Sequence, residues 1–193
     1  MDKIPLFPLN LVLFPGTHVP LRIFETRYID LVSECLRTES GFGVSLIMEG
    51  SEIGGGAKCH QFGTYARIVD WSQLEDGLLG ITAKAERRFR INEFSERENT
   101  LLEGLVEWVE EDLVPENAQK YKVLQDLLTR VLSHFEIEYA DLESKLNDPL
   151  WLGYRLAEFL PLEPRLKQEL LEMTDYSERL ARLQELLKDT DIA

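Results

Sequence analysis

Residues 4–28 read IPLFPLNLVLFPGTHVPLRIFETRY, and this stretch decides how the first half of the chain folds. Its apolar residues come in short groups that are separated by prolines, and a Pro-Gly turn pair stands at 15–16. Short apolar segments broken by turn residues predict β-strands. Proline cannot donate a ladder hydrogen bond, so we expect sheet edges or irregular connections here. The expected extended segments are residues 4–8, 11–14 and 19–24.

The same pattern continues to about Val109 and predicts a β-rich first half. Further strands are expected at residues 42–48, 62–71, 78–85, 88–91 and 105–109. One helix should begin after Glu25 and cap the β structure, because apolar residues then recur at the helical 3,4 spacing. Its apolar face is Tyr28, Leu31, Val32, Cys35 and Leu36. Residues 51–58 contain three consecutive glycines and few apolar residues, which predicts a mobile loop.

From about Pro115 the period of the apolar residues becomes helical. A long helix should begin near Pro115 and bury Tyr121, Leu124, Leu128, Val131 and Phe135. Three more helices are expected: 150–160 after an Asp148-Pro149 cap, 164–173, and one from Thr174 or Asp175 with Glu178 in capping-box spacing. The two halves predict a β-rich subdomain at residues 1–112 and a helical bundle at residues 113–193.

Composition excludes several classes of protein. The 193 residues carry a formal charge of −14, with −5 on residues 1–109 and −9 on residues 110–193. This acidity argues against sequence-independent binding to nucleic acid or anionic lipid. No apolar run approaches a membrane span, and the first residues do not resemble a signal peptide. Two cysteines are too few for a disulfide framework, so we expect a cytoplasmic protein.

Nucleotide, metal and cofactor motifs are missing from the sequence. The nearest approach to a P-loop is GGGAK at residues 54–58, where Cys59 stands in place of Ser or Thr. Cys59 and His60 are adjacent, so in a strand they would point to opposite faces and could not easily ligate one metal ion. We therefore predict no ATP hydrolysis, no cofactor, no metal site and no catalytic residue.

Three residue groups offer alternatives to a non-catalytic domain. Cys59 could act as a nucleophile with His18 or His60 as its base, although a structural thiol is the favoured interpretation. Residues 110–112, Glu-Glu-Asp, could supply a carboxylate pair, although a solvated linker is favoured. The cluster Arg87, Arg88 and Arg90 could contact RNA or an acidic peptide, but neighbouring arginines in a strand lie on opposite faces.

The opening stretch, in the form PLFPL, VLFPG and PLRIFETRY, resembles the N-terminal domain of Lon proteases. The resemblance covers nearly the whole chain, in the same order. It continues in FGV at 42–44, FGTYARIV at 62–69, DGLL at 76–79, RRFRI at 87–91, YRLAEFLPL at 154–162, KQ at 167–168 and LLE at 170–172.

This resemblance implies an α+β fold, in which a PUA-like mixed β pseudo-barrel with one inserted helix is followed by a C-terminal helical bundle. It implies a non-catalytic domain that binds unfolded or tagged polypeptides, as an adaptor or holdase with a protease or chaperone as partner. Lon's ATPase and Ser-Lys protease modules have no counterpart in these residues. The alternative is a PUA-like RNA-binding module.

No substrate-binding residue is assigned by the resemblance, so roles come from the residues themselves. Glu25 is placed to cap the following helix, and Arg27 to pair with a carboxylate across the fold. With Tyr28, these residues should hold the architecture. Exposed apolar side chains on the β half, with the loop 51–58 as a movable wall, should supply the contact surface.

Overall fold

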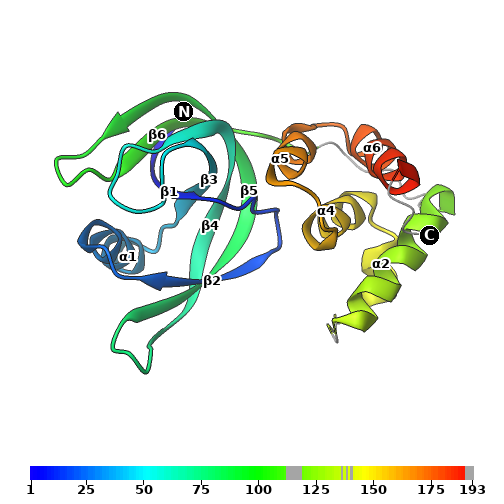
Figure 1. The fold of residues 1–193 in the computed structure, drawn as a ribbon, viewed down its shortest axis with the longest axis horizontal. Coiled ribbons are helices and arrows are strands. Elements are labelled where there is room, and N and C mark those ends of the chain that lie inside the picture. Colours follow the sequence, from blue (N-terminus) through cyan, green and yellow to red (C-terminus); the bar gives the residue numbers. More distant parts are fainter. Residues whose placement is uncertain (112–118, 136, 138, 140, 190–193) are drawn as a thin grey trace. The chain divides into compact units, whose positions relative to one another are not determined.

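The structure is a computed structural model, and it describes residues 1–111, 119–135, 137, 139 and 141–189 (Figure 1). The chain divides into two compact units, Met1–Val109 and Glu110–Ala193, which we call the β unit and the helical unit. The boundary expected between residues 112 and 113 lies outside the described residues. No helix in the described part of the chain is both long and apolar enough to cross a membrane.

The β unit is a six-stranded mixed sheet with one helix, α1, inserted after the second strand. Its elements are β1 (Asp2–Leu9), β2 (His18–Ile23), α1 (Thr26–Thr38), β3 (Phe42–Glu49), β4 (Lys58–Gln73), β5 (Leu79–Glu96) and β6 (Leu102–Trp108). The strand order is β2-β5-β4-β3-β1-β6, and β5 also pairs with β6, so the sheet curls round on itself (Figure 1). Only β1 and β3 run parallel. The α+β class is confirmed.

Three details of the strand prediction were wrong. The strands expected at 78–85 and 88–91 are one continuous strand, β5, because the cross-strand ladder with β4 runs through the charged residues between them. Residues 11–14 are not a strand. Pro5 and Pro8 lie in β1, which is inside the strand order. The sheet accommodates them because each half of β1 pairs with one neighbouring strand: residues 2–5 with β6 and residues 6–9 with β3. Pro20 lies in β2, as expected at the end of the strand order.

The core of the β unit lies between the curled sheet and the apolar face of α1. Tyr28, Leu31, Val32 and Cys35 of that face are buried against strand residues, as the spacing predicted, whereas Leu36, which was expected on the same face, is 42% exposed. A second cluster joins Phe89 of β5 to residues of β1, β4 and β6. The strands approach closely there: a Cβ on Gly63 would lie 2.6 Å from Phe89 Cζ and would also overlap the Val44 carbonyl oxygen.

The helical unit contains one 3-10 turn and five helices in its described residues. They are η1 (Gln119–Tyr121), α2 (Lys122–His134), α3 (Leu142–Leu146), α4 (Pro149–Phe159), α5 (Pro164–Glu172) and α6 (Tyr176–Asp189). The predicted Asp148 cap is confirmed, because its carboxylate accepts hydrogen bonds from the N–H groups of Leu150 and Trp151. α3 was not predicted from the sequence.

The long helix expected from Pro115 is described only from residue 122, and Pro115 itself lies outside the described residues. Its buried face also differs from the prediction: Leu127 and Leu132 are buried, whereas Phe135 lies after the helix and is exposed. The helix ends before Phe135, so the 3,4 spacing no longer fixes the direction of that side chain.

Candidate functional site

An apolar pocket of about 340 Å³ opens on the surface of the β unit. Its walls come from β1, β2, the start of α1 and the loop that follows β3. The lining residues are Phe7, Leu9, Pro20, Leu21, Arg22, Phe24, Glu25, Tyr28, Glu52 and Ile53. Phe24 and Ile53 keep 51% and 59% of their surfaces exposed, which is unusual for large apolar side chains that face one hollow. The pocket is therefore a candidate binding site.

Tyr28 and Phe7 form the aromatic wall of this pocket. Their rings stack with centroids 4.0 Å apart and planes 13° from parallel. Burial raises the pKa of the Tyr28 hydroxyl to about 12. The two residues keep only 4% and 6% of their surfaces exposed, so this wall is formed by buried aromatic packing.

A row of apolar side chains extends this site along the sheet. Trp71 of β4, Ile81 of β5 and Leu21 of β2 are direct cross-strand neighbours, so their side chains lie on one face. Leu21 lines the pocket, Ile81 in the middle is a core residue only 3% exposed, and Trp71 is 60% exposed at the other end of the row. The row also borders a second hollow of about 280 Å³. We call this set the Trp71 row.

Glu25 lines the pocket and Arg27 lies buried beside it, but they do not act as the sequence suggested. Glu25 is the N-cap residue of α1, yet its side chain makes no cap hydrogen bond. Its carboxylate instead pairs with Arg27 at 3.1 Å and accepts from the Gly54 N–H at 3.2 Å. Arg27 therefore pairs with a near neighbour, not with a carboxylate across the fold. Both roles had been predicted from the residue types alone, which do not fix side-chain direction.

The loop between β3 and β4 carries the predicted three-glycine segment and forms one wall of the pocket. Gly54, Gly55 and Gly56 all have positive φ, as glycines readily do. Hydrogen bonds hold the residues before them: the Asn10 N–H donates to the Glu52 carboxylate at 2.6 Å, and Arg27 donates to the Glu52 carbonyl oxygen at 3.4 Å. The expected loop is confirmed as irregular backbone with defined attachments, while its mobility stays a prediction.

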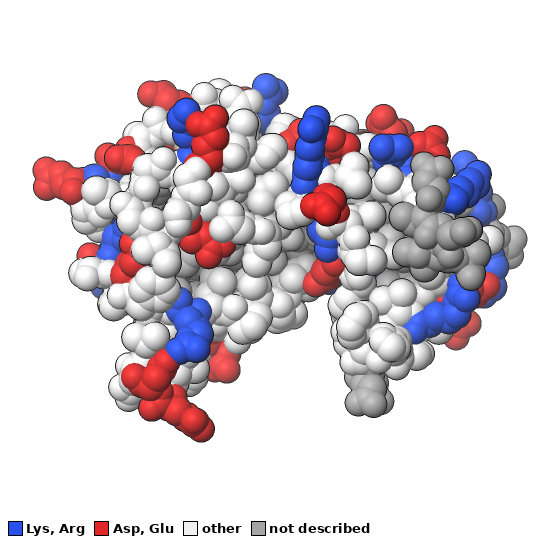
Figure 2. Space-filling view, in the orientation of Figure 1, with Lys and Arg blue, Asp and Glu red and all other residues white. Residues whose placement is uncertain are grey.

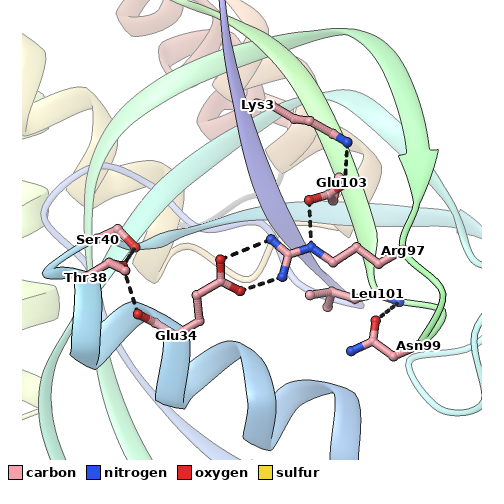
Figure 3. A network of polar contacts seen from close by, with 8 residues as sticks. All are labelled: Lys3, Glu34, Thr38, Ser40, Arg97, Asn99, Leu101 and Glu103. Carbon is pink, nitrogen blue, oxygen red and sulfur yellow. Dashed lines mark hydrogen bonds and ion pairs between the residues drawn. The ribbon is translucent and has the colours of Figure 1, made fainter.

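A second polar network joins the other end of α1 to the sheet (Figure 3). Arg97, in the connection between β5 and β6, donates to Glu34 at 2.5 and 3.2 Å and to Glu103 at 2.7 Å. Lys3 of β1 pairs with the second oxygen of Glu103 at 2.6 Å. The hydrogen bond from Arg97 lowers the pKa of Glu34. Burial raises the pKa of Glu103, but hydrogen bonds from Lys3 and Arg97 outweigh it and lower that pKa overall.

The predicted alternatives for chemistry find no support in the structure. Cys59 is buried, and burial raises its pKa to about 11, whereas a nucleophilic thiol needs a lowered pKa. Glu111 of the acidic stretch accepts a hydrogen bond from the Tyr154 hydroxyl at 2.6 Å, and residue 112 lies outside the described residues. Among the described residues, no three His, Cys, Asp or Glu side chains gather as they would around a metal ion.

The arginine cluster does not form one exposed basic patch. Arg88 is fully buried, and Arg87 lies with its guanidinium carbon 3.4 Å from the centroid of the Trp108 ring. Arg90 is three positions along the same strand from Arg87, so its side chain lies on the other face. On the face seen in Figure 2, basic side chains of the β unit are mixed with acidic ones. The geometry gives no support to an RNA-binding surface here.

Comparison with known proteins points in one direction. The family model described as "ATP-dependent protease La (LON) substrate-binding domain" matches residues 3–189. The Lon protease of Methylocella silvestris is 27% identical over 182 residues, which is 91% of this chain and 22% of that protein. The Lon protease of Parabacteroides distasonis is 27% identical over 94% of this chain and 23% of its own length. The chain thus spans less than a quarter of these two curated relatives.

Two solved structures share the fold. The Lon N-terminal domain protein from Xanthomonas campestris superposes with a TM-score of 0.81 at 37% identity, covering 96% of this chain and 98% of its own. The N-terminal domain of Mycobacterium avium complex Lon protease superposes with a TM-score of 0.74 at 22% identity, covering 98% and 100%. The second likeness concerns the fold alone.

Proposed function

We propose that this chain, which belongs to the LON substrate-binding domain family, binds unfolded polypeptide segments through its apolar pocket and the Trp71 row. The observation that carries the proposal is the gathering of exposed Phe24 and Ile53 at a hollow that is otherwise lined by apolar and aromatic residues together with Arg22, Glu25 and Glu52. An unfolded segment displays apolar side chains that a folded protein hides, and such a hollow would bury them.

The size of the site supports recognition of a few side chains. A volume of about 340 Å³ lies at the low end of the usual range for ligand pockets, about 300–1,000 Å³. Each apolar side chain that becomes buried contributes about 1.5–3 kcal/mol, from which the ordering of the bound segment is subtracted. Such a site favours weak, reversible binding.

The row sets a second contact at a defined distance from the pocket. Trp71 and Leu21 are separated by two strand spacings, about 10 Å in all. An extended segment rises about 3.3 Å per residue and its side chains alternate between two faces, so residues two or four positions apart, about 7 or 13 Å, could face both contacts. The proposed ligand is therefore an extended segment with apolar residues at that spacing.

In this proposal the domain acts without catalysis, as the substrate-recognising part of a proteolytic system or as an adaptor or holdase in the cytoplasm. The matching family model is that of a substrate-binding domain. The partner protease or chaperone belongs to the proposal. Its identity would come from isolating complexes that the intact protein forms.

A fluorescent peptide tests the proposal. The probe has 12 residues of Leu, Phe, Ser and Asn and is capped at both ends, and a second peptide replaces every Leu and Phe with Ser. We expect saturable binding of the apolar peptide only, measured by fluorescence anisotropy. Phe24→Ser and Ile53→Ser should each weaken that binding.

Val123→Ser is the matched control, because Val123 is 74% exposed and lies in the helical unit. It should leave the affinity unchanged. Equal binding of both peptides, or equal losses from all three variants, would contradict the proposed site.

A further inference from the structure

One buried side chain, Arg27 in the first turn of α1, joins three segments that are far apart in the sequence. Its guanidinium donates to the carbonyl oxygen of Thr100 at 3.2 Å and to that of Glu52 at 3.4 Å, and it pairs with the Glu25 carboxylate at 3.1 Å. The Arg27 side chain is only 8% exposed. Hydrogen bonds are electrostatically stronger where water is excluded, so this arginine fixes its partners well.

The Glu25 carboxylate extends this connection to the pocket wall. It accepts from the Gly54 N–H at 3.2 Å, while Glu52, two residues earlier, is held by Arg27 and by the Asn10 N–H. The backbone of the next residue also lies against the guanidinium: a Cβ on Gly55 would be 3.1 Å from Arg27 Nη1. The loop is thus attached on both sides of residue 53.

Ile53 lies between these two attachments and lines the pocket. On the opposite side, the Tyr28 ring lies with its centroid 4.6 Å from the Arg27 guanidinium carbon and lines the pocket as well. Arg27 therefore contacts the supports of two walls, although it is not itself one of the pocket's lining residues.

We propose that Arg27 is a positioning residue: with Glu25, it holds the Ile53 wall and the Tyr28 ring in place, so that the apolar pocket exists before a polypeptide arrives. This inference rests on the proposed function and names the residue that sets the shape of its site.

The physical reason is the freedom of the neighbouring glycines. Gly54, Gly55 and Gly56 follow one another at φ values of 88°, 85° and 73°, a region open to glycine at little cost. Ordering a free backbone costs about 1–2 kcal/mol per residue. If the Arg27 clamp fixes the loop in the free protein, this cost is not subtracted from the binding free energy.

Substitution of Arg27 in the full chain tests the proposal with two readouts. In Arg27→Met we expect faster amide hydrogen exchange at Gly54 and about tenfold weaker binding of the apolar peptide, the equivalent of one or two hydrogen bonds. Arg27→Lys keeps the charge without the planar fork and should fall between Arg27→Met and the unchanged protein.

Arg97→Met is the matched control, because Arg97 is also bonded to carboxylates from α1 and the sheet but touches neither the loop nor the pocket walls. It should leave the Gly54 exchange and the peptide affinity unchanged. If Arg27→Met does not fold, Arg27→Lys supplies both readouts.

The outcomes separate this inference from the proposed function. Unchanged Gly54 exchange in the Arg27 variants would overturn the clamp, and this readout needs no ligand. Faster exchange with unchanged affinity would overturn the positioning role while leaving the proposed function in place. No peptide binding by the unchanged protein would overturn the proposed function and, with it, the role of Arg27 in binding.

Discussion

Each end of α1 is tied to the rest of the β unit by an arginine, but the two networks differ in what they hold. At the C-terminal end, Arg97 bonds to Glu34 of α1 and to Glu103 of β6. Arg97 itself lies in the short connection between β5 and β6. At the N-terminal end, Arg27 bonds to backbone carbonyls of a turn and of a glycine-rich loop. The first network joins elements together, whereas the second shapes a surface.

Most contacts of Arg97 are also shorter than those of Arg27. Three of the four described contacts around Arg97 and Glu103 are 2.5–2.7 Å long. Those of Arg27 are 3.1–3.4 Å long, and its Nε lacks a hydrogen-bond partner within the described structure. Charge-assisted bonds between carboxylates and arginines are stronger than bonds to neutral carbonyls. Stability should therefore depend more on Arg97, and binding more on Arg27.

The largest effect should come from the core on which both networks rest. Gly63→Ala would place a Cβ 2.6 Å from Phe89 Cζ and against the Val44 carbonyl oxygen, so the unfolding free energy should fall by about 3 kcal/mol. Denaturant unfolding measures this. In Gly153→Ala, within α4, the new Cβ would lie 3.4 Å or more from the side chains of Arg179 and Leu180 in α6, and a gain of about 0.5–1 kcal/mol is expected. Equal effects of both substitutions would contradict the close approach at Gly63.

The next effect should separate the two ends of α1. Arg97→Met removes hydrogen bonds to two carboxylates, of which Glu103 is only 9% exposed, and should lower the unfolding free energy by about 2 kcal/mol. The peptide affinity of the folded fraction should stay the same. If Arg97→Met lost peptide affinity without losing stability, Arg97 would act on binding, which contradicts the role assigned to it.

A smaller effect should follow from pH. The folded protein holds the pKa values of Glu34 and Glu103 below the ordinary value of 4.5. Their contribution to stability is therefore complete above about pH 4.5 and is lost as the pH falls through the lowered values. Unfolding followed between pH 6 and 3 should show this loss in the unchanged protein and less of it in Arg97→Met. Parallel curves for the two proteins would show that Arg97 does not set these pKa values.

The smallest effects should come from neutralising one carboxylate at each end. Glu25→Gln can still accept from Arg27 or from the Gly54 N–H but loses its charge, so we expect about threefold weaker peptide binding and little change in stability. Glu34→Gln should instead cost about 1 kcal/mol of stability and leave binding unchanged. Isothermal titration measures the peptide affinity of both variants, and denaturant unfolding measures their stability. If both variants lost affinity and stability alike, the two ends of α1 would not differ in role.

Much of the fold could be predicted because it depends on local patterns. The apolar face of α1, the Asp148 cap and most strands follow from spacing and turn residues that act within a few positions. The joining of two expected strands into β5 could not be predicted, because the ladder with β4 is a long-range contact. The position of Pro5 and Pro8 inside the sheet could not be predicted either, because it depends on the long-range pairing of each half of β1 with a different strand.

The candidate site was predicted only in outline. Exposed apolar residues on the β half and the 51–58 loop were expected, but not which side chains meet. Ile53 carries a weak signal, since it is apolar among turn residues, whereas Phe24 belongs to the expected extended segment 19–24 and lies just beyond the end of β2. Trp71 carries none, because its exposure follows from its position in the hairpin of β4 and β5 beyond the core.

The arrangement of β5 has a mechanical consequence. Its first residues, 79–84, pair with β2 beside the pocket, and its later residues, 89–96, pair with β6, the last strand before the helical unit in the sequence. β2 and β5 are antiparallel over six residue pairs, so a pull along β2 loads their hydrogen bonds together, in shear, instead of opening them one at a time. A load along β2 would thus be shared between several bonds and passed to β5, which continues without a break to its pairing with β6.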